Sequence, residues 1–373
     1  MHCDKCVMPI WDGKLQFGRP GLGLSENGTT CVACKRAEDA KAIDWDARHN
    51  ELEHLCDRHR KGNGDPDVIV PVSGGKDSHF QVKALRDLGM TPFLVCVCDC
   101  FGVSEAGKHN LANLERYAAG LITWRQNPDR MKEQMRFAFE HWGKPTHPVD
   151  LAIYAVPPRI AAQMNVPLIV YGEDISWTYG GSGAKDSPDA SAQLDNDVVA
   201  SVDAGEDKES RCAFRPVQAP DFVEPIYLSY FLKWSGRVNA DVAMGMGFKA
   251  SDDPSFGDKG WDRAGFCENY DQIDSLGYVV HPWLKWVKFG AGRVSDVCSN
   301  LIRGGYMTRQ EAVDKVREWE GPSDTEARED FCAVLGYTTE EFWEIVGRHT
   351  NALIHVPSSR MHYGTLKPEL QLR

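Results

Sequence analysis

The chain has 373 residues, and 42 Lys and Arg against 54 Asp and Glu give a net charge of −12. This length allows two or three domains of about 100–200 residues each. Its 42% hydrophobic and 26% charged residues exclude wholesale disorder, a collagen-like repeat and a small disulfide scaffold. An acidic chain disfavours nucleic-acid partners, because phosphate contacts need clustered Lys and Arg.

The sequence shows no sign of a membrane span or a secretion signal. No apolar run approaches the ~18–20 residues needed to cross a bilayer. Residues 1–6 lack the apolar core of a signal peptide. We therefore expect a cytoplasmic protein.

Four of the twelve cysteines form two C-x-x-C pairs near the N-terminus, separated by 24 residues: Cys3, Cys6, Cys31 and Cys34. This spacing can place four thiolates around one tetrahedral zinc ion. The intervening segment is rich in Gly and Pro and has little core of its own, so a metal would supply folding energy. We predict a structural zinc ribbon. The alternatives are unligated reduced thiols and an iron–sulfur cluster.

Next along the chain, residues 38–61 are charged and nearly free of Gly and Pro, which predicts a connecting helix. An alternating pattern follows, with buried strands predicted at 68–72, 93–98 and 167–171 and a helix at 78–88. Strands that alternate with helices predict a doubly wound, parallel α/β sheet.

Prolines conflict with two of these elements. Pro71 lies in the first predicted strand, although Pro cannot donate a hydrogen bond to a central ladder. Pro157 and Pro158 predict an interruption of the helix that follows Asp150.

Residues 179–210 are rich in Gly, Ser, Ala and Asp, and we interpret them as a mobile loop over a site or a plain disordered insertion. The C-terminal part is predicted to be helical, with capping boxes at Thr308/Glu311 and Thr338/Glu341. We therefore divide the chain into a zinc ribbon with its connecting helix (1–62), a nucleotide-binding domain (63–235) and a helical C-terminal region (236–373).

The most specific signal lies between the first strand and its helix, in the motif Ser73-Gly74-Gly75-Lys76-Asp77-Ser78. Two glycines allow a sharp turn close to a ligand. The free N–H groups of the following helix favour an anion, and the Ser hydroxyls and Lys76 add donors and positive charge. A carboxylate beside an anion site is unfavourable unless it binds Mg²⁺ or accepts hydrogen bonds from nearby backbone N–H groups. We expect one of these two roles for Asp77.

This motif resembles the pyrophosphate loop of the PP-loop ATP pyrophosphatases. The resemblance implies a doubly wound sheet and ATP cleavage between the α and β phosphates. It also implies that residues 73–78 hold the triphosphate, that Asp99 contacts the adenosine, and that Gly172, Glu173 and Asp174 form a second nucleotide-facing turn. Carboxyl ends of such strands meet at one edge of the sheet.

Further motifs resemble the N-acetyl sugar amidotransferases of bacterial surface-polysaccharide biosynthesis. They are the cysteine pairs with Met8-Pro9, then residues 121–124, Tyr171 to Asp174, Gly292-Arg293 and residues 307–312. The resemblance implies conversion of an acetamido group on a sugar or nucleotide-sugar into an acetamidino group. The implied cofactors are ATP, Mg²⁺ and a structural Zn²⁺.

The chemistry needs charge neutralisation on the departing pyrophosphate. We expect Lys76, the loop amides and Mg²⁺ to provide it, with Asp77 as a further catalytic residue that holds Mg²⁺. Asp174 or Glu173 is expected to position Mg²⁺ or the nucleophile. Asp150 is expected either to face the substrate or to cap a helix. Arg293 and Arg303 are expected either to contact an acidic sugar or a phosphate, or to form surface salt bridges.

The sequence shows no recognisable domain that would generate ammonia. No region has room for a glutaminase domain, and His2 stands where a processed N-terminal Cys nucleophile would lie. We therefore expect ammonia from solution or from a separate glutaminase/cyclase-like partner.

The main alternative is a PP-loop sulfurtransferase that thiolates tRNA or a small molecule. It would use some of the additional cysteines, a set that includes Cys96, Cys98 and Cys100, as persulfide carriers or cluster ligands. A phosphoadenylyl-sulfate reductase is disfavoured because residues 357–373 contain no Cys. Intact Lys76 and Asp77 disfavour a degenerate zinc-ribbon adaptor.

Overall fold

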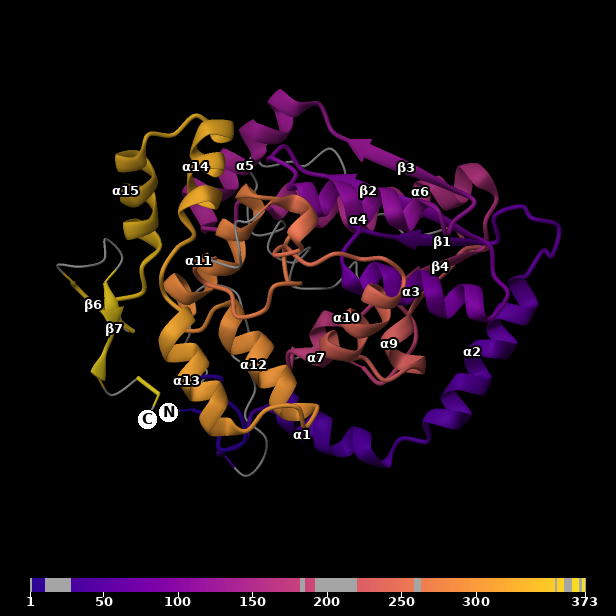
Figure 1. Cartoon of the computed structure of the whole chain (residues 1–373), viewed down its shortest axis with the longest axis horizontal. Helices are drawn as coiled ribbons and strands as arrows, with labels where there is room; N and C mark the ends of the chain where they lie inside the picture. The colour runs from indigo at the N-terminus through magenta and orange to yellow at the C-terminus, as the bar shows by residue number, and fades with distance from the viewer. Residues whose placement is uncertain are drawn as a thin grey trace.

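The computed structural model describes residues 2–10, 28–181, 185–191, 220–257, 263–352, 354–358, 364–368 and 371–372. The predicted loop over 179–210 lies mostly outside these residues, as does the middle of the predicted zinc ribbon. Figure 1 shows the α/β part of the chain beside a group of C-terminal helices, with the N-terminal helices running along the lower edge.

The N-terminal connection is not one helix, as predicted over 38–61, but several. These are α1 (Val32–Asp39), the 3-10 turn η1 (Ala40–Ala42) and α2 (Trp45–His59). The chain becomes extended at Ile43, and the Asp44 side chain accepts a hydrogen bond from the Ala47 N–H at 3.0 Å. Asp44 therefore begins a new helix, and the unbroken polar composition did not reveal this cap.

The sheet has five parallel strands in the order β3-β2-β1-β4-β5. The strands are β1 (Val68–Pro71), β2 (Pro92–Cys98), β3 (Gly120–Arg125), β4 (Leu168–Tyr171) and β5 (Glu224–Tyr227). The α/β class and the three expected strands are confirmed. The sequence pattern did not predict β3 and β5, which are edge strands with partly exposed residues.

Pro71 fits the central strand because it is the last residue of β1. The N–H of Val72 donates to the Val95 carbonyl on β2, so the nitrogen of Pro71 faces the opposite neighbour, β4. Pairing between β1 and β4 covers only Val68 and Ile69. No ladder bond is therefore lost at Pro71.

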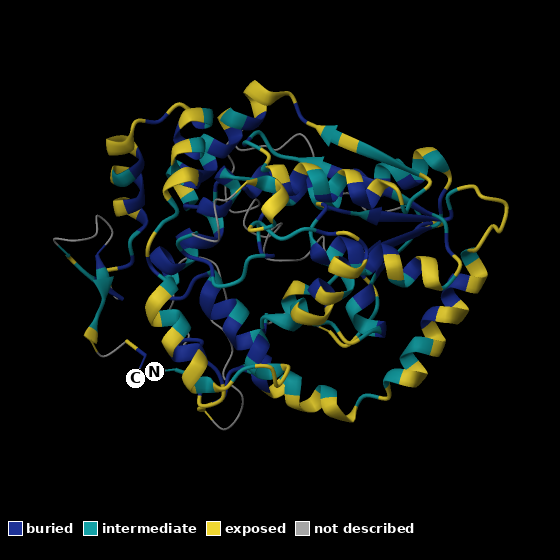
Figure 2. Ribbon diagram, in the orientation of Figure 1, coloured by how far each residue is buried: buried dark blue, intermediate teal, exposed yellow. Residues whose placement is uncertain are grey.

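Helices cover both faces of the sheet. The helices α2, α3 (Lys76–Asp87) and α4 (Glu105–Glu115) pack on the face that carries Val68 and Val70. The helix α6 (His147–Met164) packs on the face that carries Ile69. In Figure 2 the central strands are mostly dark blue, the edge strand β3 is teal and yellow, and the outer side of α2 is largely exposed.

The predicted interruption at Pro157 and Pro158 is wrong, because α6 continues through both residues. An interior proline costs about 3 kcal/mol. Both prolines and the neighbouring Val156 are buried, and the helix packs along β1, β2 and β4. This burial outweighs the lost hydrogen bonds.

The C-terminal part is helical, as predicted, and both capping boxes are present. Its helices are α11 (Val280–Phe289), α12 (Arg293–Arg303), α13 (Arg309–Trp319), α14 (Thr325–Leu335) and α15 (Thr339–His349), followed by the antiparallel pair β6 (His355–Val356) and β7 (Thr365–Leu366). The shorter elements are α7 (Ile175–Thr178), α9 (Leu228–Phe231), η4 (Pro254–Phe256) and η5 (Gly277–Val279).

Two helices pack against elements that lie on the other side of the predicted domain boundary at residue 235. The helix α5 (Pro128–Trp142) joins the core of α11, α14 and α15 through Phe139, and α10 (Gly236–Gly245) packs against α3. The division at 62 and 235 therefore stays a prediction. Among the described residues, no helix combines the length and apolar character required to cross a bilayer.

Replacing Phe139 with Ala should strongly destabilise the C-terminal helices. Its ring is fully buried against Phe331, Phe342 and Tyr337, and such truncations cost about 3–5 kcal/mol. Thermal denaturation followed by circular dichroism would measure the loss. Phe222→Ala, at a ring that is 48% exposed, is the control. Equal midpoints for the two variants would contradict this account of the core.

Candidate functional site

The loop at residues 73–78 forms a bend that leads directly into α3. Gly74 has φ +93°, and a Cβ there would lie 3.0 Å from the Leu111 nitrogen. The Ser73 N–H donates to Ser78 Oγ at 3.1 Å, and the Gly75 N–H donates to Ser73 Oγ at 3.2 Å. These contacts hold the loop around the N-terminus of α3, where free N–H groups favour an anion.

The loop lies where the strand order reverses. From β1 the chain proceeds to β2 and β3 on one side of the sheet and later to β4 and β5 on the other. In open α/β sheets, ligands bind at the carboxyl ends of the strands at such a point. The turn Gly172-Glu173-Asp174 directly follows β4, the neighbour of β1. The expected convergence of these two strand ends is present.

A cavity of about 570 Å³ opens beside the loop. Its wall combines the start of α3, the turn after β4, the segment 229–237, and residues of α1 and α12. The charged and polar residues that line it are Arg36, Lys41, Lys76, Asp77, Glu173, Thr178, Tyr179, Ser229, Lys233, Ser235, Arg237, Tyr270, Asp271, Arg293, Asn300 and Arg303.

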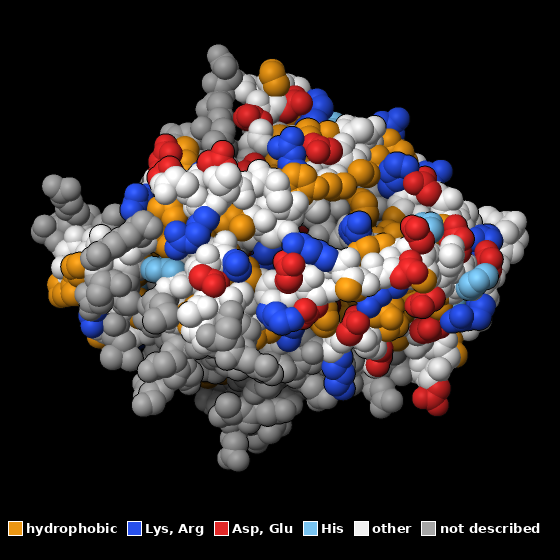
Figure 3. Space-filling view, turned by 90° about the horizontal axis from the view of Figure 1, so that it is seen from below, with side chains coloured by type: hydrophobic (Ala, Val, Ile, Leu, Met, Phe, Trp, Pro, Cys, Tyr) orange, Lys and Arg blue, Asp and Glu red, His pale blue; other side chains and the backbone are white. Residues whose placement is uncertain are grey.

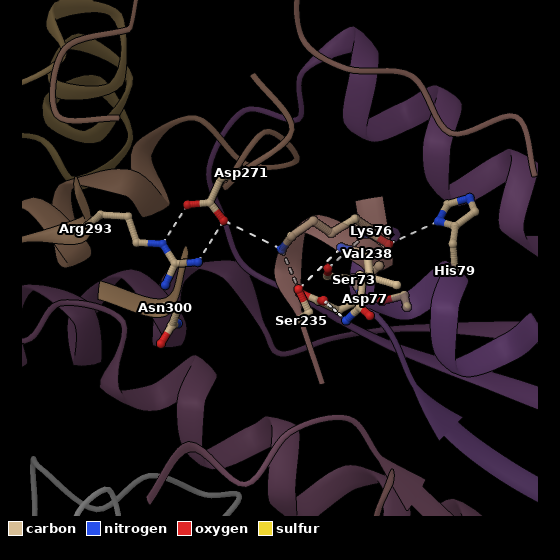
Figure 4. A network of polar contacts seen from close by, with 12 residues as sticks. Ser73, Lys76, Asp77, His79, Ser235, Val238, Asp271, Arg293 and Asn300 are labelled. Carbon is tan, nitrogen blue, oxygen red and sulfur yellow. Dashed lines mark hydrogen bonds and ion pairs between the residues drawn. The ribbon is translucent and has the colours of Figure 1, made fainter. Parts of the chain in front are cut away.

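The centre of this wall is an ion network (Figure 4). Lys76 Nζ lies 2.8 Å from Asp77 Oδ2 and 3.8 Å from Asp271 Oδ1. Arg293 contacts Asp271 in a bidentate pair at 2.6 and 2.7 Å. Asp271 thus joins Lys76 of the loop to the C-terminal helix α12.

The network keeps its members charged despite burial. Burial opposes the charge of Asp271, but Arg293 and then Lys76 outweigh it and lower the pKa of Asp271 to about 2. Burial likewise opposes the charge of Lys76, but Asp77 and Asp271 raise its pKa above the ordinary value. Lys76 is therefore a fixed positive charge at the edge of the cavity.

Three residues outside the predicted site support the loop: Asp271, described above, Asn239 and His79. Asn239 donates to Asp77 Oδ1 at 2.7 Å. His79 lies 3.0 Å, by its Nδ1, from the Gly75 carbonyl. Of these, His79 directly follows the motif, whereas Asp271 and Asn239 belong to no motif and lie far along the chain.

The two acids after β4 have different surroundings. Asp174 is the N-cap of α7, accepting the Trp177 N–H at 3.2 Å, and its side chain is absent from the cavity lining. Glu173 lines the cavity. Burial, and then the nearby Asp77, raise the pKa of Glu173 to about 7. At neutral pH Glu173 can therefore both hold and release a proton.

Asp99 is half-buried beside the C-terminal region and does not line the cavity. Its carboxylate accepts the Phe101 N–H at 2.9 Å and the Ser275 hydroxyl at 2.7 Å. Burial raises its pKa to about 6. Adenosine contact by Asp99 stays a prediction.

Asp150 is not a helix cap, because α6 begins at His147 with Thr146 as its N-cap residue. Its carboxylate accepts hydrogen bonds from Thr146 Oγ1 at 3.3 Å and from the Tyr278 hydroxyl at 3.4 Å. It does not line the cavity. The two arginines, by contrast, do: Arg293 binds Asp271, and Arg303 donates to Asn300 Oδ1 at 2.6 Å.

The four N-terminal cysteines come together in a buried cluster. Their Sγ atoms lie within 4.8 Å of one another, and Cys6 Sγ is 3.8 Å from Cys31 Sγ. Tetrahedral zinc with ~2.3 Å bonds requires sulfur atoms about 3.8 Å apart. Backbone N–H groups of Lys5 and Cys31 donate to Cys3 Sγ at 3.4 and 3.3 Å. The donor set and geometry fit a zinc ion or another thiolate-bound metal.

The additional cysteines lie elsewhere. Cys96, Cys98 and Cys100 lie in or directly after β2, and Cys100 Sγ is 3.4 Å from Met135 Sδ. Among the described residues, no cysteine lines the cavity.

Asp271 and Arg293, which line one side of the cavity, lie in a part of the chain that matches a known protein family. Residues 264–366 match the family described as "LPS biosynthesis protein WbpG-like, C-terminal domain". This WbpG-like region contains Asp271, Arg293, Asn300 and Arg303. The match supports the link to polysaccharide-biosynthesis proteins. No curated protein matches the chain.

We expect purified protein to carry a single thiolate-bound zinc ion per chain. Cys31→Ser should lose most of it, because a thiolate ligand is replaced by a hydroxyl. Elemental analysis would measure the metal, and Cys100→Ser, outside the cluster, is the control. Iron and visible absorption in place of zinc would favour the cluster alternative, and metal-free protein would contradict the site.

Glu173→Gln should change how stability depends on pH. The pKa of Glu173 in the folded protein, about 7, lies above the ordinary 4.5. The folded state therefore retains a proton that the unfolded chain loses, and stability falls as pH rises through this window. The variant should gain thermal stability over the native chain at about pH 8 but not at about pH 5. Glu115→Gln, at an exposed carboxylate, is the control; equal midpoint differences at both pH values would contradict the assignment.

Proposed function

We propose that this protein is an ATP-dependent amidotransferase of lipopolysaccharide or related surface-polysaccharide biosynthesis. It adenylates the acetamido oxygen of a sugar or nucleotide-sugar and lets ammonia displace AMP, which gives an acetamidino group. One observation carries the proposal: Lys76 and Asp77 of the loop line a cavity that residues of the WbpG-like region, Asp271 and Arg293 among them, also line.

The loop supplies the features that a polyphosphate needs. The N-terminus of α3 presents free N–H groups and Lys76 adds a buried positive charge, so an anion at this point is stabilised. Asp77 and Glu173 line the same cavity, and carboxylates are the protein ligands that Mg²⁺ prefers. We assign ATP and Mg²⁺ to this part of the cavity, with residues 73–78 and Gly172 at the nucleotide, and we keep Asp99 as a candidate for the adenosine.

The reaction has two balanced steps. In the first, the acetamide oxygen attacks the α-phosphorus, and the bond between this phosphorus and the pyrophosphate oxygen breaks. In the second, ammonia adds to the imidate carbon, the bond from carbon to the adenylated oxygen breaks, and AMP leaves with that oxygen. Overall, NH₃ gives up two protons, so that NH replaces the oxygen in the product. Lys76 opposes the charge that grows on pyrophosphate in the first step.

The acidic side chains then have distinct roles. Glu173, which lines the cavity with a pKa near neutrality, is suited to accept a proton from the incoming ammonia. Asp174 caps α7 and so acts by holding the turn that carries Glu173. Asp77, held by Asn239, orients Lys76 and provides an oxygen ligand for Mg²⁺.

The substrate and ammonia source follow from the same proposal. Arg293 and Arg303 lie on the WbpG-like side of the cavity and are placed to bind an anionic group of the sugar substrate. A separate glutaminase/cyclase-like protein is proposed to deliver ammonia. Figure 3 shows Lys and Arg interspersed with Asp and Glu on one face, which supports a small-molecule substrate over a nucleic acid. We propose that the protein acts in the cytoplasm.

The decisive experiment incubates the protein with ATP, Mg²⁺, ammonia and candidate acetamido sugars. Mass spectrometry should find the small mass loss that accompanies replacement of oxygen by NH, together with AMP and pyrophosphate. Lys76→Ala should lower the rate by about 10²–10³-fold, because a charge that stabilises the transition state is lost.

Lys83→Ala is the matched control, because Lys83 lies on the same helix, is exposed, and pairs with Asp87 at 2.6 Å on the surface of that helix. Release of ADP and orthophosphate would contradict attack at the α-phosphorus. Sulfur in the product would instead support the sulfurtransferase alternative.

A further inference from the structure

The helix that carries two of the clustered cysteines is also part of the cavity wall. Cys31 is the N-cap residue of α1, and its Sγ accepts the Cys34 N–H at 3.4 Å. Further along α1, Ala33, Arg36 and Ala37 line the cavity. A metal held by Cys31 and Cys34 would therefore fix the first turn of a helix that forms this wall.

Arg36 connects α1 to the segment after Glu173. One guanidinium nitrogen donates to the carbonyls of Ser176 and Trp177 at 2.9 and 3.3 Å, and the other donates to the Gly181 carbonyl at 2.9 Å. The guanidinium also lies over the Trp177 ring, 5.2 Å from its centroid. The Ser176 and Trp177 carbonyls also accept the N–H groups of Gly181 and Gly180 at 2.7 and 3.4 Å. The guanidinium adds a charged donor to them at the C-terminal end of α7.

The two segments are also in close backbone contact. Gly180 has φ +78°, and a Cβ at this position would lie 3.0 Å from the nitrogen of Ala33, between the two ligand cysteines of α1. A side chain at residue 180 would separate the helix from the segment. The Arg36 contacts are therefore part of an interface and not an isolated surface interaction.

The segment that Arg36 holds orients two groups of the cavity. Thr178 is a hydrogen-bond partner of the Glu173 carboxyl. The Tyr179 hydroxyl accepts hydrogen bonds from Arg293 at 3.2 Å and from Asn300 at 3.4 Å. A shift of residues 175–181 would therefore displace Glu173 and remove one partner of Arg293.

We propose that Arg36 is a positioning residue through which the metal-bound cysteine cluster holds residues 175–181, and with them Glu173, in the cavity wall. The cluster is then a determinant of the cavity and not only a stabiliser of the N-terminus. The cluster itself is small, with Met8, Ile10 and Ala291 among its few apolar neighbours, so its position depends on the metal. The inference rests on the cavity geometry and is independent of the reaction proposed above.

Hydrogen–deuterium exchange of the metal-loaded protein tests this proposal without any turnover. Arg36→Gln should raise amide exchange in residues 175–181 by about tenfold or more, because hydrogen bonds from a charged donor are lost. Zinc content and exchange in β1 and β2 should stay as in the native chain. Arg36→Lys keeps the positive charge but lacks the two guanidinium nitrogens that reach separate carbonyls. It should give an intermediate rate of amide exchange.

Lys35→Gln is the matched control, because Lys35 is the neighbouring residue on α1 and its side chain is 56% exposed. Arg36→Gln with full zinc content and native exchange over 175–181 would overturn the proposal.

Removal of the metal from the native chain by a chelator is the second arm, and it does not depend on how the variants fold. Exchange over 175–181 should rise together with zinc release, while β1 and β2 stay protected. Zinc release that leaves 175–181 protected would overturn the proposal. These results are independent of whether the enzymatic assay succeeds, so failure of the proposed function would leave this test intact.

Discussion

Asp271 is the residue on which the cavity depends most. It is buried between Lys76, at the start of α3, and Arg293, at the start of α12, and so it joins the α/β part of the chain to the WbpG-like region. A carboxylate in this position is stable only because both cations compensate for its lost hydration. The same pairing holds Lys76 at the edge of the cavity, so one interaction both connects the two parts and places the charge that a polyphosphate would meet.

The topology of the sheet explains why this connection forms at the loop of residues 73–78. The order of strands reverses between β1 and β4, so the segments that follow these strands leave in different directions and a crevice lies between them. The loop at 73–78 and the Glu173 turn form two sides of this crevice. The C-terminal helix α12 and the N-terminal helix α1 close it. Segments far apart in the chain, the segment 229–237 among them, therefore contribute to one site. Arg36 connects the helix that carries Cys34 to this site.

Local patterns predicted much of the fold and part of the site. The apolar runs before Ser73 and Gly172 predicted β1 and β4, because central parallel strands are buried on both faces. The glycines of the loop predicted a sharp turn, and the structure shows a bend there in which Gly74 has positive φ. The cysteine spacing predicted a four-sulfur cluster, which the fold brings together. The continuation of α6 through Pro157 and Pro158 was not predictable in this way, because it depends on burial against a sheet formed by distant segments.

Local sequence determined features of contiguous residues: a glycine-containing loop between a strand and a helix, two cysteine pairs, and caps such as Thr308 with Glu311. These depend on hydrogen bonds and spacing within a few residues, so they can be read locally. Only the tertiary structure decided that Asp271 and Asn239 support the loop, that Glu173 and not Asp174 lines the cavity, and that Arg36 holds the segment after them. Those contacts join residues from about 100 to 200 positions apart, and their energy depends on burial and packing that only the complete fold creates.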